Sequence, residues 1–168
     1  MDEPHDVDQA LVSVGERCTR TLRLSRDEIA DFARITGDTN PLHFDLRAAQ
    51  RARHGEIIAS GQQVSSMLIG LASSYFSRAD DQVSRELLCL NFNFAFKAPV
   101  FAEQDIEMQW TVGSVEWSSR LQGWIGLVDG NARVGGRVCV IGRGTVLVKA
   151  VADASAPDSA PAAPVQTA

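Results

Sequence analysis

The chain has 168 residues and a net charge of −5, and 45% of its residues are hydrophobic. This length and composition are typical of one globular domain with its own core, and they do not comfortably accommodate two. The acidic balance argues against a nucleic-acid-binding protein, which normally carries a basic face, although a few local arginines could still bind an anionic small molecule.

The two ends of the chain differ in composition from its middle. Residues 1–10 are acidic, and residues 152–168 are rich in Ala, Pro and Ser. Neither composition can bury a core, so we expect a flexible N-terminus, one domain over residues 11–151 and a disordered tail. The N-terminus lacks the apolar segment of a secretory signal, and no apolar run is long enough to span a membrane. These features predict a cytoplasmic protein without a membrane partner.

Three cysteines, Cys18, Cys89 and Cys139, lie far apart in the sequence. No CxxC pattern and no Cys/His cluster suggests a zinc site, so we predict that no metal is bound. Each cysteine stands among apolar or alternating residues, which predicts three buried, reduced thiols.

The first elements expected are a strand and a helix. Residues 17–24 alternate between polar and apolar side chains, a pattern typical of a strand. Ser25 and Glu28 have the spacing of a capping box, which predicts that a helix begins there. Gly37 is a plausible end for that helix because glycine readily adopts the left-handed conformation of a helix C-terminus.

Two further helices are expected after a loop over residues 38–45. Residues 46–53 read as a short polar helix, and a longer helix is predicted after Gly61. Its apolar residues recur at helical spacing, and its other face carries small residues, so we expect other structure to wrap around it. The apolar positions are Val64, Met67, Leu68, Leu71 and Tyr75.

Long strands are predicted for the rest of the chain. Residues 86–97 place five apolar side chains in strict alternation, which strongly indicates a strand with one apolar face. Three more strands are expected over 105–115, 119–128 and 133–149, with a turn at residues 129–131 between the last two. Glycines in the last strand predict bulges or sharp curvature of the sheet. The alternating residues are Leu88, Leu90, Phe92, Phe94 and Phe96.

This order of elements predicts an α+β hot-dog fold, in which a curved antiparallel sheet wraps around a central helix. The alternative is another α+β sandwich. A single curved sheet leaves long edge strands exposed, and such edges are usually paired or covered. We therefore expect a homodimer that joins two sheets.

Asp38 and His43 are the first candidates for chemistry. They flank Asn40 and Pro41, and proline stiffens the loop and favours an extended conformation for the residue before it. A carboxylate and an imidazole on one stiff loop can move protons to and from water at neutral pH. Taken alone, the same residues are more often ordinary hydrogen-bonded loop residues.

Gly61 is the second candidate, because a backbone N–H at the start of a buried helix can polarise a carbonyl. A glycine that merely permits a tight turn is the simpler alternative.

Three basic residues could bind phosphate groups: Arg51, Arg53 and Lys97. Single basic residues, however, usually belong to the solvated surface. The sequence contains no Ser-His-Asp arrangement, no GxGxxG motif and no P-loop.

Several of these segments together resemble a known family. The run from Phe32 to Asp45, which contains Gly37-Asp38-Thr39-Asn40-Pro41-Leu42-His43, looks like the hydratase motif of MaoC-like, (R)-specific enoyl-CoA hydratases. Residues 57–61 resemble the segment that leads into the central helix of that family, and residues 93–101 resemble its strand before a Pro-Val-Phe turn. The resemblance covers about residues 12–150.

The resemblance implies a function and a role for each matching residue. Asp38 and His43 would hold a water and add it syn across the double bond of a trans-2-enoyl-CoA, giving a (3R)-hydroxyacyl-CoA. The Gly61 N–H would polarise the thioester carbonyl, and Asn40 would brace the loop. The substrate would be the only partner besides a second copy of the chain, and no cofactor would be needed.

The helix head departs from the family pattern in one respect. The family commonly has a histidine immediately before the glycine, where this chain has Ser60, and the glycine is followed by Gln62 and Gln63. We therefore expect Ser60 and Gln62 to contact the substrate and to favour a polar or short acyl group.

Two other functions compete with hydration. A hot-dog thioesterase usually carries a carboxylate on its central helix, and residues 61–77 contain neither Asp nor Glu. A non-catalytic acyl-binding subunit is the third hypothesis, because an intact acid–base pair does not prove turnover.

Overall fold

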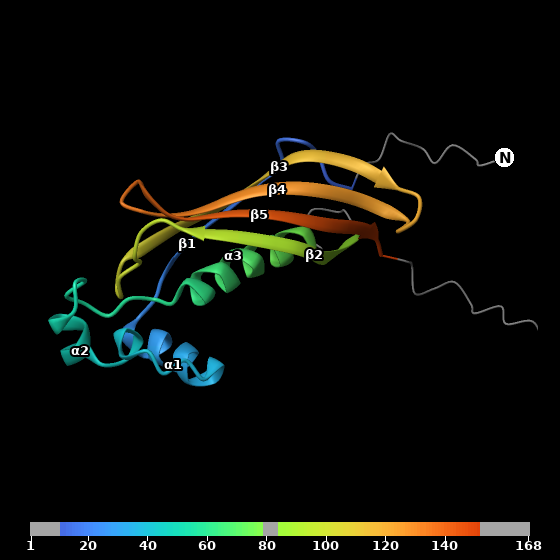
Figure 1. Cartoon of the computed structure of the whole chain (residues 1–168). Helices are drawn as coiled ribbons and strands as arrows, with labels where there is room; N and C mark the ends of the chain where they lie inside the picture. The colour runs from blue at the N-terminus through green and yellow to red at the C-terminus, as the bar shows by residue number, and fades with distance from the viewer. Residues whose placement is uncertain (1–10, 79–83, 152–168) are drawn as a thin grey trace, which may run out of the picture.

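The computed structural model describes residues 11–78 and 84–151 (Figure 1). The predicted flexible N-terminus and disordered tail, residues 1–10 and 152–168, lie outside the described residues. The described elements, in chain order, are β1 (Arg17–Arg23), α1 (Arg26–Thr36), the 3₁₀ helix η1 (Pro41–His43), α2 (Leu46–Arg51), α3 (Gly61–Phe76), β2 (Arg85–Phe96), β3 (Asp105–Ser118), β4 (Gly123–Val134) and β5 (Arg137–Ala150).

The five strands form one antiparallel sheet in the order β1-β3-β4-β5-β2. Figure 1 shows this sheet curving over α3, with α1 and α2 beyond the N-terminal end of that helix. The predicted hot-dog arrangement of a curved sheet and a central helix is therefore confirmed. β1 and β2 are the edge strands of the sheet.

Aromatic side chains of the sheet fill the space between the sheet and α3, and strand glycines make room for them. The indole Nε1 of Trp110 donates a hydrogen bond of 2.7 Å to the carbonyl of Leu68 on α3, and both residues are fully buried. A Cβ at Gly130 would collide with the Trp110 ring, and one at Gly142 would lie 2.8 Å from the ring of Phe94. These strand glycines thus make room for aromatic rings inside the curve of the sheet.

The turn predicted at residues 129–131 is wrong. β4 runs without interruption from Gly123 to Val134, and the tight turn to β5 consists of Gly135 and Gly136. Both of these glycines have positive φ angles, 53° and 79°, as a two-residue hairpin turn requires. The Asp-Gly-Asn sequence was misleading because its glycine is needed for Trp110 and not for a turn.

The single apolar face predicted for the strand at 86–97 is also wrong, although the strand exists. The pairing of β2 with β5 shifts between Cys89 and Asn91, so one extra residue bulges there and reverses the alternation. Leu87 therefore packs against the core, whereas Leu88 and Leu90 are 48% and 47% exposed. A bulge depends on the partner strand, which a local pattern does not reveal.

Two smaller predictions are corrected as well. Cys89 is exposed, whereas Cys18 and Cys139 are buried as expected. The polar helix expected over residues 46–53 ends at Arg51. Among the described residues, no helix is both long enough and apolar enough to cross a membrane.

Candidate active site

The end of α1 positions Asp38. The predicted capping box is present: the Glu28 N–H donates to the Ser25 hydroxyl, and the Ser25 N–H donates to the Glu28 carboxylate. Gly37 ends the helix in the left-handed conformation, and the next N–H, that of Asp38, donates to the carbonyl of Ala33 at 2.8 Å. The carboxylate of Asp38 thus leaves the helix in a fixed direction.

The turn after Asp38 is held by side chains that accept hydrogen bonds from its backbone. Asp38 Oδ1 accepts from the Asn40 N–H at 2.9 Å, and Asn40 Oδ1 accepts from the Leu42 N–H at 3.2 Å. The second bond caps η1, in which Pro41 supplies the first residue. Because Asn40 Oδ1 faces the backbone, its Nδ2 is left to face His43, at 3.5 Å from the imidazole Nε2.

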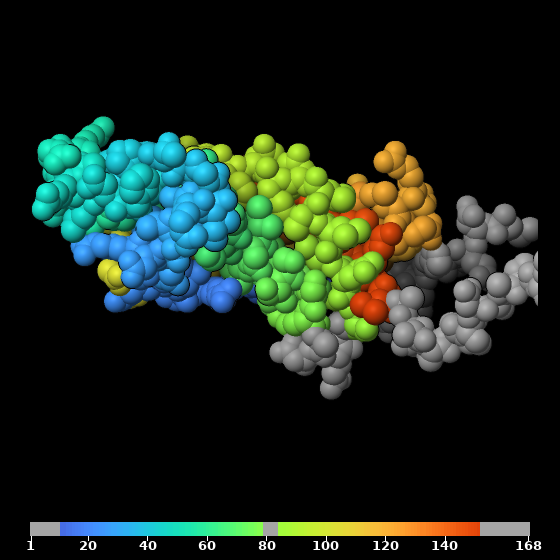
Figure 2. Space-filling model, turned by 90° about the horizontal axis from the view of Figure 1, so that it is seen from below, coloured from blue at the N-terminus to red at the C-terminus, as the bar shows by residue number. Residues whose placement is uncertain are grey.

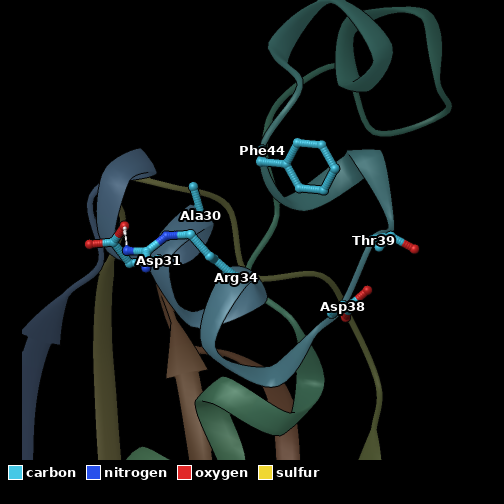
Figure 3. A pocket seen from close by; sticks show the side chains of 6 residues that line it. All are labelled: Ala30, Asp31, Arg34, Asp38, Thr39 and Phe44. Carbon is cyan, nitrogen blue, oxygen red and sulfur yellow. Dashed lines mark hydrogen bonds and ion pairs between the residues drawn. The ribbon is translucent and has the colours of Figure 1, made fainter.

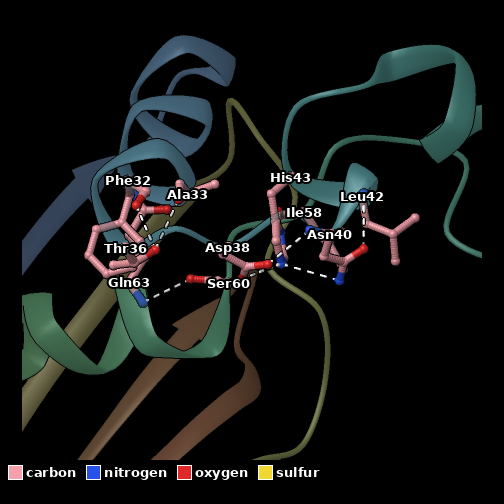
Figure 4. A network of polar contacts seen from close by, with 10 residues as sticks. All are labelled: Phe32, Ala33, Thr36, Asp38, Asn40, Leu42, His43, Ile58, Ser60 and Gln63. Carbon is pink, nitrogen blue, oxygen red and sulfur yellow. Dashed lines mark hydrogen bonds and ion pairs between the residues drawn. The ribbon is translucent and has the colours of Figure 1, made fainter.

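His43 is buried, with 6% of its surface exposed, and its tautomer is fixed by the backbone. Its Nδ1 lies 2.7 Å from the carbonyl oxygen of Ile58, which can only accept, so Nδ1 carries the proton. In the neutral ring the lone pair is therefore on Nε2, which lies 3.6 Å from Asp38 Oδ2. Figure 4 shows the imidazole between Asp38 and Asn40.

This geometry can bind one water between two proton acceptors. A separation of 3.6 Å between Nε2 of His43 and Oδ2 of Asp38 is too long for a direct hydrogen bond, and neither neutral imidazole nor carboxylate offers a proton there. A water molecule can donate to both. The side chain of Asp38 remains 28% exposed, so water can reach it.

The segment that orients His43 also leads into α3. The Ile58 N–H donates to the Leu42 carbonyl at 3.2 Å, so Ile58 binds the loop from Asp38 to His43 through both of its backbone groups. Three residues later the chain reaches Gly61, the first residue of α3. Three residues span at most about 10 Å, so the backbone of Ile58, which is bonded to His43, lies close to the helix head.

The head of α3 has a buried cap, an exposed glutamine and a backbone N–H without a described partner. The Ser60 hydroxyl is buried and caps the helix by accepting from the Gln63 N–H at 3.2 Å. The Gly61 N–H has no hydrogen-bond partner within the described part of the chain, and Gln62 is exposed. A Cβ at Gly61 would lie 2.7 Å from the ring of Phe96, so a larger residue at this position would force that ring to move.

An ion pair joins the start of α1 to the segment before Ile58. Arg26 donates to both oxygens of Glu56, with Nε–Oε1 and Nη2–Oε2 distances of 3.1 Å and 2.6 Å. The hydrogen bonds from Arg26 lower the pKa of the Glu56 carboxyl, and Glu56 raises the pKa of the guanidinium. The pair therefore ties the start of α1, the helix that precedes Asp38, to the segment whose Ile58 carbonyl holds His43.

A groove reaches Asp38 from the surface. Figure 3 shows side chains from the last turns of α1 and from the loop after it around this groove, whose volume is about 330 Å³. Phe44 and Thr39 contribute its loop side, and the Arg34–Asp31 ion pair lies on its helix side. Solvent or a small ligand can thus approach the carboxylate without crossing the core.

The sequence prediction missed two contributors, the Ile58 carbonyl and the ring of Phe96. The Ile58 carbonyl that fixes the tautomer gives no signal in the sequence, because any residue supplies a carbonyl. Phe96 was assigned only to the apolar face of a strand. Gln63, which the sequence places at the helix head with Gln62, is 2% exposed; its Nε2 donates to the Glu28 carbonyl at 3.2 Å, while its Oε1 has no partner among the described residues.

The segment that contains this site matches a known protein family. The model of the MaoC-like domain family matches residues 11–122, which are most of the chain and include the whole loop from Asp38 to His43 as well as α3. The chain belongs to this family. The predicted resemblance is therefore confirmed, and the family supports chemistry of the hydratase or dehydratase class.

Individual relatives are more distant. A mitochondrial 3-hydroxyacyl-[acyl-carrier-protein] dehydratase of Arabidopsis thaliana is 29% identical over 98 residues, which are 58% of this chain and 54% of that protein. The chain thus spans about half the length of the curated relatives it matches.

Solved structures confirm the fold. An (R)-hydratase from A. caviae involved in PHA biosynthesis superposes with a TM-score of 0.69 at 24% identity, covering 80% of this chain and 96% of that one. The C-terminally truncated HadBC (3R-hydroxyacyl-ACP dehydratase) complex from Mycobacterium tuberculosis gives a TM-score of 0.65 at 18% identity, covering 81% and 96%.

Proposed function

We propose that the protein is a hydratase that adds water to a trans-2-enoyl thioester to give a (3R)-hydroxyacyl thioester, or that it catalyses the reverse dehydration. The observation that carries this proposal is the facing pair of Asp38 Oδ2 and the lone pair of His43 Nε2, with the tautomer set by Ile58. Membership of the MaoC-like family supports the same reaction class.

In the forward reaction the shared water attacks C3 of the enoyl group. One member of the pair, Asp38 or His43, takes a proton from the water as the C3–O bond forms, and the π electrons move toward the thioester carbonyl. The pair then delivers a proton to C2, on the same face, and the carbonyl is restored. Positioned acid–base groups of this kind commonly contribute about 10²–10⁴-fold to the rate.

The Gly61 N–H is the proposed donor to the thioester oxygen as negative charge develops on it. It belongs to the first turn of a 16-residue helix, where the helix dipole adds to the hydrogen bond. One such donor is worth about 3 kcal/mol of transition-state stabilisation. Asn40, Ser60 and Gln62 are the proposed substrate-contacting residues. We propose that the protein itself holds no cofactor.

We propose coenzyme A as the carrier of the acyl group. The curated relatives are named as dehydratases of acyl-carrier-protein substrates, so a carrier protein is the alternative. A panel of crotonyl-CoA and the same acyl group on a carrier protein distinguishes the two by their kcat/KM values.

A homodimer through the edge strand β2 is the proposed assembly. β2 has 12 residues, and its exposed Leu88, Leu90 and Phe96 would otherwise remain in water at an open sheet edge. The HadBC structure is described as a complex, which makes a heterodimer the alternative. Sedimentation equilibrium of the purified chain distinguishes a homodimer from a monomer that requires a different partner chain.

The cytoplasmic location expected from the sequence stays a prediction.

The competing functions receive less support. α3 carries neither Asp nor Glu along its whole length, so the carboxylate that a hot-dog thioesterase usually places there is missing from Gly61–Phe76. A non-catalytic acyl-binding subunit would not need the His43 tautomer to be fixed with its lone pair toward Asp38.

Hydration of crotonyl-CoA tests the proposal. Addition of water removes the conjugation of the thioester, so the reaction is followed by loss of its ultraviolet absorbance, and the configuration of the product is determined by chiral chromatography. The proposal expects turnover to the (3R) product. Release of free thiol without loss of the double bond would instead identify a thioesterase, and binding without either reaction would identify an acyl-binding subunit.

A further inference from the structure

Three arginines follow one another within seven residues at α2, and none of them belongs to an ion pair of the described residues. Arg47 and Arg51 belong to this helix, and Arg53 follows it by two residues. All three are exposed, and none of their guanidinium groups makes a hydrogen bond or an ion pair with the residues that the structure describes. We call these residues the α2 arginine cluster.

The arrangement of the cluster is unfavourable for the helix that carries it. Arg47 and Arg51 are four residues apart, so they lie on the same face of α2 and repel each other. A six-residue helix is only marginally stable, and such a repulsion weakens it further. An anionic ligand would remove this repulsion, because guanidinium groups bind phosphate through two parallel N–H bonds.

The cluster is adjacent to the acid–base pair. α2 begins three residues after His43, and the four residues from His43 to Arg47 span at most about 14 Å. Figure 1 shows α2 beyond the N-terminal end of α3, and Figure 2 shows its atoms on the surface beside α1. A long substrate whose reactive end lies at Gly61 could therefore reach this helix with its other end.

We propose that the α2 arginine cluster binds the phosphate groups of the coenzyme A part of the substrate. This inference rests on the proposed function, since it assigns the far end of the same thioester. The reacting acyl group lies at Asp38 and His43, and the nucleotide phosphates lie against Arg47 and Arg51, so the cluster selects the carrier and not the acyl group.

The surroundings of the cluster favour a small polyanion over an acidic carrier protein. Asp27, Glu28 and Asp31 are exposed on the neighbouring α1, and Asp45 and Glu56 flank the cluster in sequence. A stable protein partner covers about 800 Å² on each side, so it would bring its own acids against these carboxylates. A few phosphates can contact the arginines alone.

The test compares ligands with and without phosphates. Calorimetry measures the binding of coenzyme A, adenosine 3′,5′-bisphosphate and phosphate-free pantetheine to the wild-type chain and to the double variant Arg47→Gln/Arg51→Gln. The matched control is Arg120→Gln, an exposed arginine in the β3–β4 turn, which Figure 1 places at the opposite end of the sheet. Circular dichroism checks that all variants are folded.

The expected result is that the double variant binds coenzyme A and the bisphosphate roughly tenfold more weakly, a change typical of one lost charge-assisted hydrogen bond, while pantetheine binding and the Arg120→Gln control do not change. The ratio of kcat/KM for crotonyl-CoA over crotonyl-pantetheine should fall by the same factor. Equal binding of coenzyme A by variant and wild type, or a loss confined to a carrier-protein substrate, would overturn the assignment. Because calorimetry needs no turnover, an inactive wild-type chain would refute the proposed function without deciding the binding site.

Discussion

Replacing Gly61 by alanine perturbs the head of α3 in a way whose size follows from the structure. The new Cβ would lie 2.7 Å from the ring of Phe96, whereas ordinary contacts of a Cβ begin at 3.4 Å, so the ring must retreat by about 0.7 Å. Phe96 is 57% exposed at the end of β2, so it has room to move. We expect a loss of stability near the low end of the 1–3 kcal/mol typical of overpacking, about 1 kcal/mol.

The effect on activity should be larger than the effect on stability. In the proposed mechanism a thioester oxygen approaches the Gly61 N–H, and we expect a methyl group on the same residue, together with the displaced ring, to hinder that approach. Loss of one such contact typically lowers kcat by about 10²–10³-fold, the equivalent of 2.7–4 kcal/mol. Steady-state hydration of crotonyl-CoA measures the change in kcat, and thermal unfolding measures the change in stability.

A double variant separates the two consequences of the methyl group. In Gly61→Ala/Phe96→Ala the ring is absent, so the methyl group has nothing to collide with. Gly61→Ala should therefore cost less stability in the Phe96→Ala background than in the wild type. Activity should recover only to the extent that the ring, and not the methyl group itself, blocked the oxygen. Gly61→Ala with wild-type kcat would refute the assignment of this N–H to the thioester carbonyl.

Three further predictions concern the cap of η1, the Arg26–Glu56 ion pair and the buried thiol of Cys18. Asn40→Ala removes the cap of η1, so it should cost about 1 kcal/mol in chemical denaturation and lower kcat, whereas Asn40→Asp should retain the cap and most of the stability. Because Arg26 lowers the pKa of Glu56, this pair stabilises the fold above the ordinary carboxyl pKa of 4.5, and the stabilisation is lost as the pH falls through the lower folded-state value. The stability difference between wild type and Glu56→Gln should therefore shrink below about pH 4.5, and a constant difference in denaturation midpoints from pH 3 to 7 would contradict the pairing. Burial raises the pKa of Cys18 to about 11, so at pH 8 a thiol reagent should leave this buried thiol of the folded protein unmodified, whereas in denaturant the same reagent should modify it, as mass spectrometry would show.

Much of the fold could be predicted from the sequence because its signals are local. The capping box at Ser25, the stop at Gly37 and the apolar period of α3 each depend on residues within a few positions, and each is confirmed. The order of one wrapped helix followed by long strands then leaves few architectures besides the hot dog.

The errors concern contacts between distant segments. Gly130 resembled a turn residue, but it is a strand position because Trp110 needs the space above it. The bulge beside Cys89 appears only in the pairing of β2 with β5, so alternation alone assigned Leu88 to the wrong face. In both cases the deciding partner lies many residues away.

The residues of the candidate site could be selected from the sequence, but the contacts that orient them could not. Asp38, His43 and Gly61 could be selected from residue type, the stiff turn and the family resemblance. The tautomer of His43 depends on the Ile58 carbonyl, fifteen residues away, and the space at Gly61 depends on Phe96. Geometry, not residue identity, therefore supplies the argument that the imidazole lone pair faces the carboxylate.

Crotonyl-CoA hydration by Asp38→Asn and His43→Ala is the most direct measurement of the central claim. Each variant removes one of the two groups that can take a proton from the proposed water, and we expect each to lower kcat by about 10²–10⁴-fold while the circular dichroism spectrum and the sedimentation behaviour stay those of the wild type. If both folded variants hydrate crotonyl-CoA at the wild-type rate, Asp38 and His43 are not the acid–base pair of this protein.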